Sequence, residues 1–130
     1  FKLSSGTWVS VGTLRLKVVS ALAPLVQDAV IAGHDRGEVG VLLFASPAAK
    51  EVPPAELAER TRAALSALRS EGGGSSQTPT RALWLAEPPS ADAGEITDKG
   101  YVNQRVAQDH RAADVAALFA AEAGPGVVKL

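Results

Sequence analysis

One lysine in this sequence, Lys99, lies where its side chain could take part in a reaction. Lys99 is the only cation between Arg81 and Arg105, and it follows several acidic residues in a loop flanked by Gly94 and Gly100. A lysine on a mobile loop can carry a point charge into a site that is made elsewhere. The pattern alone also fits an ordinary surface lysine, which is the commoner case.

The same loop, residues 87–100, contains three carboxylates, those of Asp92, Glu95 and Asp98. Carboxylate oxygens could ligate a hard cation. Their spacing is not that of an EF-hand, which needs ligands at alternate positions and a closing glutamate. The sequence therefore favours a solvated acidic loop, and we predict no metal site.

Cysteine and histidine offer little further chemistry. The chain has no cysteine, which excludes disulfides, thiolate zinc sites and a cysteine nucleophile. A catalytic histidine needs a nucleophile and an orienting acid around it. His34 and His110 have Asp35 and Asp109 beside them only as sequence neighbours. The pattern favours a structural role for both histidines.

The start of the chain contains the remaining candidates. Lys2, Arg15 and Lys17 give the first twenty residues three cations and no acid. Such a patch could meet a phosphate or an acidic partner surface, although a solvated face is the favoured interpretation. Trp8 lies beside polar residues, so it could be an exposed surface on which a base stacks. A hairpin residue packed on the domain is an equal alternative.

Composition limits the classes of function. The 130 residues are 46% apolar and 21% charged with a net charge of -1, which is typical of one globular domain without a basic field for nucleic acid or a membrane. No apolar run approaches the roughly 18 residues that span a bilayer, and no secretory signal is visible. The lack of cysteine fits a reducing compartment, so we expect a cytoplasmic protein. Because the chain has no methionine and starts at Phe1, we expect a fragment of a longer parent.

The hydrophobic pattern predicts an α+β fold, with a small β-hairpin, a mainly three-stranded sheet and about three helices. Strands are expected at 26–33 and 38–45, joined antiparallel by the tight turn 34–37, and at 81–86. Helices are expected at 11–22, where a strand is the alternative, from Pro53-Pro54 onward, and at 103–121. The positions expected to face inward on the last helix are Val106, His110, Ala113, Ala117 and Phe119.

Two segments are expected to be irregular. Gly72–Thr80 predicts a flexible connection, because its glycine run lacks the Lys-Ser/Thr ending of a P-loop and follows a helix. Gly124-Pro125-Gly126 is expected to end the last helix. Residues 122–130 are then expected to form a flexible tail.

Three blocks of the sequence resemble the C-terminal end of acyl-adenylate-forming enzymes, most closely the feruloyl-CoA synthetases. The first is Gly94–Arg105 (GEITDKGYVNQR), preceded by AEPPSADA. The others are Phe1–Gly12 (FKLSSGTWVSVG), which is similar to the segment after the interdomain hinge, and QDAVIAGHDRGEVGVLLF, which is similar to the two central strands. The resemblance extends from Phe1 to about Phe119.

The resemblance implies that residues 1–121 are a single C-terminal lid domain of a larger ligase. The absent N-terminal domain would be its partner, holding the acid pocket and most contacts to ATP and its Mg²⁺. Such enzymes join a carboxylate to the α-phosphate of ATP, and the thiol of coenzyme A then expels AMP. The lid rotates between the two half-reactions. The implied substrates are ATP, coenzyme A and a small aromatic acid of the hydroxycinnamate type, as in aromatic acid catabolism. The fragment alone is expected to be inactive.

The resemblance also gives Lys99 a catalytic role in adenylation, where an ammonium would stabilise charge at the carboxylate and the α-phosphate. Many family members have Gly-Lys followed by an apolar residue, whereas Gly94 is followed here by Glu95 and Ile96. Lys99 is four positions from that slot. Other branches place the lysine after a threonine, and Thr97 stands two residues before Lys99.

Four further residues are implied to bind coenzyme A. Gly6 matches a glycine whose backbone lines the tunnel for the pantetheine arm, where a missing Cβ lets the arm pass close. Lys2 belongs to the same block, and Trp8 would lie at the mouth of the tunnel. Arg81 would lie near the nucleotide end.

Two alternatives to the coenzyme A ligase remain open. One is a free-standing α+β module that binds a ligand or a protein partner. The other is the lid of an adenylate-forming enzyme that loads the thiol of a carrier protein, with the basic start of the chain in the partner surface.

Overall fold

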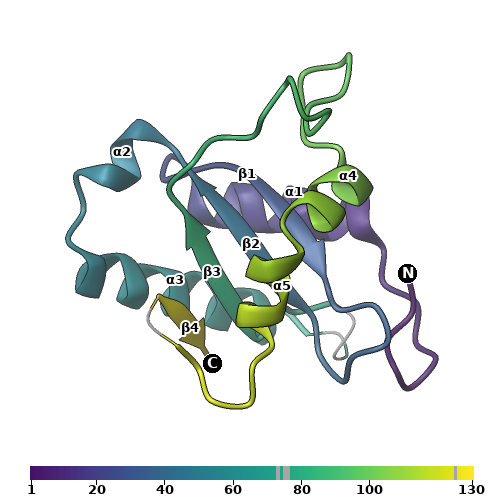
Figure 1. The fold of residues 1–130 in the computed structure, drawn as a ribbon. Helices are drawn as coiled ribbons and strands as arrows, with labels where there is room; N and C mark the ends of the chain where they lie inside the picture. The colour runs from purple at the N-terminus through teal and green to yellow at the C-terminus, as the bar shows by residue number, and fades with distance from the viewer. Residues whose placement is uncertain (73, 75–76, 125) are drawn as a thin grey trace.

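Helices lie on both sides of a small sheet (Figure 1). The computed structural model describes residues 1–72, 74, 77–124 and 126–130. The elements are α1 (Val11–Leu22), β1 (Val26–Ala32), β2 (Gly40–Ala45), α2 (Pro47–Lys50), α3 (Pro54–Ser70), β3 (Arg81–Leu85), α4 (Gln104–His110), α5 (Ala112–Leu118) and β4 (Val127–Lys129). The predicted α+β class is confirmed, and so are the helix at 11–22 and the antiparallel pair β1–β2.

The sheet is mixed, with the strand order β1-β2-β3-β4. β2 and β3 are parallel, and the other neighbouring pairs are antiparallel. A parallel pair needs a crossover connection, and α3 supplies it. In this strand order β1 is an edge strand, and α4, which follows β3 in the chain, packs against it.

Each face of the sheet buries its own apolar cluster. Helices α1 and α3 cover one face, where Leu14, Val18 and Leu65 pack on side chains of β1 and β2. Helices α4 and α5 cover the other face, where Ala107 and Leu118 pack near Phe44. The two clusters give the chain a hydrophobic core of its own, which is what an independently folding domain requires.

The end of the chain differs from the sequence prediction in three ways. Residues Val127–Lys129 form β4 on the edge of β3, so this part of the expected tail is a strand. The expected single helix at 103–121 is two helices, because Arg111 leaves the helical conformation with φ -109° and ψ 35°. Ala107 and Leu118 are consequently the buried positions, while His110, Ala113 and Ala117 are exposed. The short helix α2 was not predicted.

Some predictions fall partly outside the described residues. The connection Gly72–Thr80 includes residues 73, 75 and 76, and the helix end at Gly124–Gly126 includes residue 125. The start of the chain, by contrast, is described throughout. It forms a turn closed by one antiparallel bridge between Lys2 and Trp8, in agreement with the predicted hairpin.

Gly33 has a backbone conformation that L-residues rarely adopt. Its φ is +142°, and a Cβ would lie 2.7 Å from the carbonyl oxygen of Glu38. Because that oxygen belongs to the backbone and cannot swing aside, we expect Gly33→Ala to lower the free energy of unfolding by about 1–3 kcal/mol. Gly37→Ala in the same turn is the control, since its Cβ would meet no described atom within 4 Å. Equal losses in urea unfolding would contradict this explanation.

Candidate functional site

Lys99 lies at the tip of a small hairpin between β3 and α4. Ile96 and Val102 form an antiparallel bridge at its base. Above the bridge, Thr97 N donates to Tyr101 O at 2.7 Å, and Gly100 N donates to Thr97 O at 2.9 Å. Gly100 has φ +91°, which suits glycine in a tight turn. We call residues 96–102 the lysine hairpin. Lys99 is exposed and forms no ion pair with any described residue.

Glu95, directly before the hairpin, is the most deeply buried charged residue among those described, with 0% exposure. Its carboxylate accepts hydrogen bonds from Arg111 Nε at 2.9 Å, Arg111 Nη2 at 3.1 Å and Ser90 N at 2.7 Å. His110 Nδ1 lies 2.9 Å from the same carboxylate. The predicted solvated loop is thus wrong at this residue, because Glu95 joins the loop to the junction of α4 and α5.

The electrostatics of Glu95 follow from these contacts. Burial alone would raise its pKa, but the hydrogen bonds from Arg111, Ser90 N and His110 outweigh burial. They lower the pKa to about 2 from an ordinary value of 4.5. The carboxylate is therefore ionised at neutral pH and holds Arg111 as a buried ion pair.

Side chains of α4 hold the edge of β1. Gln104 accepts from Ile31 N at 2.9 Å and donates to Ala29 O at 2.8 Å, much as a neighbouring strand would. Gln108 donates to Ile31 O at 3.2 Å. These bonds satisfy backbone groups that an edge strand otherwise leaves open. They also fix α4, and with it the segment that follows the lysine hairpin.

The residues implied to bind coenzyme A at the chain start do lie together. Lys2 Nζ is 4.7 Å from the ring centroid of Trp8, and the indole is 69% exposed. The exposed alternative for Trp8 is therefore the one that the structure contains. Gly6 lies at the turn with φ +85°, and no described atom would lie within 4 Å of a Cβ there. We call residues 1–9 the N-terminal turn.

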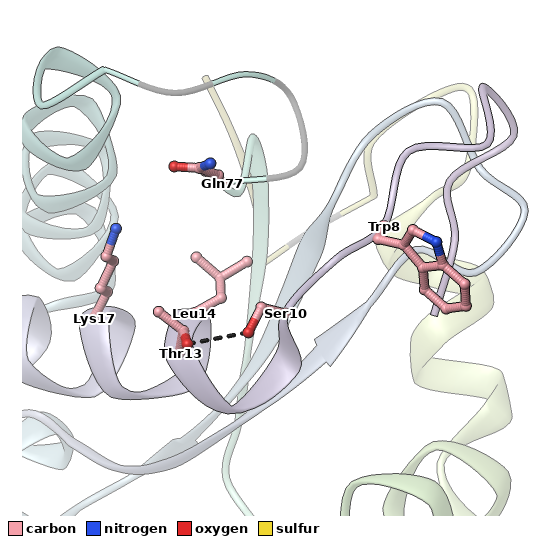
Figure 2. Close-up of a pocket in the computed structure, with 6 residues that line it drawn as sticks. All are labelled: Trp8, Ser10, Thr13, Leu14, Lys17 and Gln77. Atoms are coloured by element: carbon pink, nitrogen blue, oxygen red, sulfur yellow. Dashed lines mark hydrogen bonds between the residues drawn. The ribbon is translucent and has the colours of Figure 1, made fainter.

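A hollow of about 200 Å³ borders the N-terminal turn. Its lining residues are Trp8, Ser10, Thr13, Leu14, Lys17 and Gln77. Figure 2 shows the Ser10 hydroxyl bonded to Thr13 at the start of α1, with Lys17 one turn further along. The lining includes a cation and hydroxyl groups, which suit a polar ligand with a phosphate or amide group, while the ring of Trp8 points away from the other lining residues in Figure 2.

Arg81 is occupied within the domain. It is 8% exposed, and its Nε donates to Glu38 Oε1 at 2.8 Å. Its Nη1 donates to Ala120 O at 2.9 Å and to Leu118 O at 3.3 Å. These bonds tie β3 to the β1–β2 connection and to the end of α5, so groups within the domain bind the guanidinium. The structure does not bring Arg81 to the exposed surface of the N-terminal turn.

Lys99 lies apart from the candidate residues of the N-terminal turn. Figure 1 shows the loop that carries it projecting from one end of the molecule, while the N-terminal turn lies beside the β1–β2 connection at the other. Ser4 N donates to Arg36 O in that connection at 2.8 Å. The domain therefore presents two separate candidate surfaces.

The sequence did not reveal that Glu95, Arg111 and Asp28 hold the lysine hairpin. For Asp28 a signal was present, because a charge inside the apolar run VQDAVIAG must find a partner when the strand is buried. For Glu95 and Arg111 there was none, since they are separated by sixteen positions with no common motif.

In the part of the chain that the structure describes, no three His, Cys, Asp or Glu side chains gather so that they could hold a metal ion. Within the same residues, no helix has the length and apolar character to cross a membrane.

Comparison with known families identifies the class of this domain. Residues 2–123 match the family described as the AMP-binding enzyme C-terminal domain. Because the match covers most of the chain, the chain belongs to that family. The predicted relation to adenylate-forming enzymes is confirmed at this level, whereas the likeness to feruloyl-CoA synthetases stays a prediction. No curated protein sequence matches the chain.

Solved structures with the same fold include adenylation domains of carboxylic acid reductases. The adenylation domain of a carboxylate reductase from Mycobacterium chelonae superimposes with a TM-score of 0.74 and 19% identity, covering 92% of this chain and 19% of that one. An A-PCP didomain from Segniliparus rugosus, solved in complex with AMP, gives 0.73 and 21%, covering 92% and 17%. The chain thus spans about a fifth of the length of these structures, and at these identities the likeness shows the fold alone.

Proposed function

We propose that this chain is the mobile C-terminal lid of an ATP-dependent aryl-CoA ligase of the feruloyl-CoA synthetase type. A larger N-terminal domain of the same polypeptide would hold the aromatic acid and ATP with its Mg²⁺, and the reaction would take place in the cytoplasm. The observation that carries the proposal is Lys99, an exposed cation at the tip of an anchored hairpin in a member of this family.

The proposed first half-reaction uses the lysine hairpin. A carboxylate oxygen of the acid attacks the α-phosphorus of ATP and pyrophosphate leaves. Negative charge is brought together at the carboxylate and the α-phosphate, and the Lys99 ammonium stabilises it there. An anion such as Glu95 would repel the phosphate, and its burial keeps it away.

The proposed second half-reaction uses the N-terminal turn. The thiol of coenzyme A attacks the acyl carbon and AMP leaves with the bonding electrons. Because the loop that carries Lys99 and the N-terminal turn lie at different ends of the domain (Figure 1), a rotation of the lid would withdraw the first as it brings in the second. Gly6 would leave room for the pantetheine arm, with Trp8 and Lys2 at its entrance.

A second candidate is a carrier-protein thiol in place of coenzyme A. It is favoured by two solved neighbours that are A domains of carboxylic acid reductases, one of them solved together with its PCP. A free-standing module is the weaker alternative, because the family is a domain of larger enzymes.

The test is a thiol-acceptor assay on the full-length enzyme that carries this domain. With ferulate and ATP, we expect pyrophosphate release, followed by thioester formation with coenzyme A. Thioester formation only with a phosphopantetheinylated carrier protein would select the second candidate. No pyrophosphate release with any of a panel of carboxylic acids would contradict both.

The N-terminal turn provides a separate prediction. Gly6→Leu in the full-length enzyme should lower the rate of thioester formation from supplied acyl-adenylate by about 10-fold or more while sparing adenylation, because the side chain would enter the path of the thiol arm. Gly6→Ala is the control for the strain that φ +85° imposes on any side chain, and its loss should be smaller. A normal thioester step in Gly6→Leu would refute the tunnel assignment.

A further inference from the structure

Asp28 is a charged residue inside the apolar strand β1, and it is 5% exposed. Its Oδ1 accepts hydrogen bonds from Arg15 Nε and from Ala29 N, both at 2.7 Å. Its Oδ2 accepts from Arg15 Nη2 at 3.0 Å and from Val102 N at 2.9 Å. Both carboxylate oxygens thus have two donors, which fixes the side chain in one orientation.

Asp28 and its partner Arg15 each contact the lysine hairpin. Val102 is the residue at the base of the hairpin on its outgoing leg. Tyr101 comes next toward the tip, and its ring centroid lies 5.0 Å from Cζ of Arg15. The pair Arg15–Asp28 therefore touches two successive residues of the leg that leads from Lys99 into α4.

The incoming leg has a different anchor. Glu95 is bound by Arg111 from the junction of α4 and α5. Asn103 N also donates to Glu95 O at 2.7 Å, which closes the hairpin beneath its base. With one leg held by the pair Arg111–Glu95 and the other by the pair Arg15–Asp28, the tip has a defined direction relative to the sheet.

We propose that Asp28, oriented by Arg15, is a positioning residue that sets the place of the Lys99 ammonium in the adenylation step. This inference rests on the proposed function. Asp28 touches no reacting atom in this scheme, and it acts by holding Val102. A displacement of a catalytic group by about 1 Å can lower a rate by about 100-fold, so an anchor of this kind has a measurable kinetic effect.

The kinetic test uses Asp28→Asn in the full-length enzyme. The amide has nearly the same shape but one acceptor oxygen, so it cannot hold Val102, Ala29 and both nitrogens of Arg15. We expect acyl-adenylate formation to slow by about 10- to 100-fold, with thioester formation from supplied acyl-adenylate within about 2-fold of the wild type.

A matched control is a buried hydrogen bond that lies far from the hairpin. Thr61 of α3 is 0% exposed and accepts from Trp84 Nε1 at 2.9 Å, on the other face of the sheet from α4. Thr61→Val should destabilise the domain and leave the ratio of the two half-reaction rates unchanged. If Asp28→Asn also slows both half-reactions equally, its role is only structural and the proposal is overturned.

Two further readouts separate this inference from the proposed function. Amide hydrogen exchange on this chain should show that Val102 loses protection in Asp28→Asn, and unchanged protection would overturn the anchor. In a Lys99→Ala background, Asp28→Asn should slow adenylation no further, whereas an additive loss would overturn the positioning role. A wild-type rate in Lys99→Ala would instead refute the proposed function. A slow Lys99→Ala with a normal Asp28→Asn would refute only this inference.

Discussion

Lys99→Ala in the full-length enzyme should lower the rate of acyl-adenylate formation by about 10²–10³-fold, the loss expected when one group that stabilises transition-state charge is removed. The hairpin is already held at both legs, so the variant changes the charge and leaves the backbone in place. Thioester formation from supplied acyl-adenylate should remain near the wild-type rate, because the proposed site of that step is the N-terminal turn. Separate assays of pyrophosphate release and of thioester formation measure the two steps.

Two variants control this experiment. Lys50→Ala removes another exposed lysine, at the end of α2, and should leave both half-reactions unchanged. Lys99→Arg keeps a positive charge but replaces a compact ammonium with a larger planar group, so we expect only partial activity. An equal loss of both half-reactions in Lys99→Ala would show that the lysine acts in folding or binding and would refute its assignment to adenylation.

The fold was predictable where the sequence pattern is local. The alternation of apolar runs and a tight turn defines β1 and β2, and Pro53-Pro54 marks the start of α3. The end of the chain was not predictable in the same way. β4 has three residues, and it is a strand only because the edge of β3 offers backbone partners. The break at Arg111 likewise depends on a tertiary contact, since the guanidinium binds Glu95 on a distant loop.

The candidate residues could be predicted from the sequence, but the groups that hold them in place could not. Lys99 could be selected because it is an isolated cation between two glycines, and Trp8 because of its polar neighbours. The groups that hold the hairpin are acids and arginines, which composition assigns to a solvated surface. Their burial follows from packing of α4 on the edge of β1, and only the fold brings Asp28 and Val102 together across 74 positions.

The second large effect expected concerns stability. Glu95→Gln keeps the shape of the side chain but leaves the guanidinium of Arg111, which is 10% exposed, without its counter-charge. Breaking a buried ion pair on one side costs about 3–5 kcal/mol. We expect a loss of that size in the free energy of unfolding, measured by urea denaturation of this chain. The exposed pair Arg62–Glu59 is the matched control, and Glu59→Gln should cost at most about 1 kcal/mol.

A loss of this size is a large part of the stability of a typical domain, which is about 5–15 kcal/mol. A milder variant therefore completes the series. His110→Ala removes one hydrogen bond to Glu95 from a half-exposed side chain, and should cost about 1 kcal/mol. We expect the largest loss of unfolding free energy in Glu95→Gln, a smaller one in His110→Ala and the smallest in Glu59→Gln. A Glu95→Gln protein as stable as the wild type would show that the ion pair contributes no net stability.

The pH dependence of unfolding tests the same ion pair, because acid protonates the carboxylate of Glu95 in the wild-type chain. The pKa of Glu95 is lowered to about 2 in the folded chain, from an ordinary value of 4.5. A lowered folded-state pKa contributes stability that is fully present above the unfolded value. That contribution is lost as the pH falls from about 4.5 toward 2, where the carboxylate takes up its proton. In Glu95→Gln the slope of stability against pH over this range should be shallower. The slope should not vanish, because hydrogen bonds from Thr80 and Arg81 outweigh burial and also lower the pKa of Glu38.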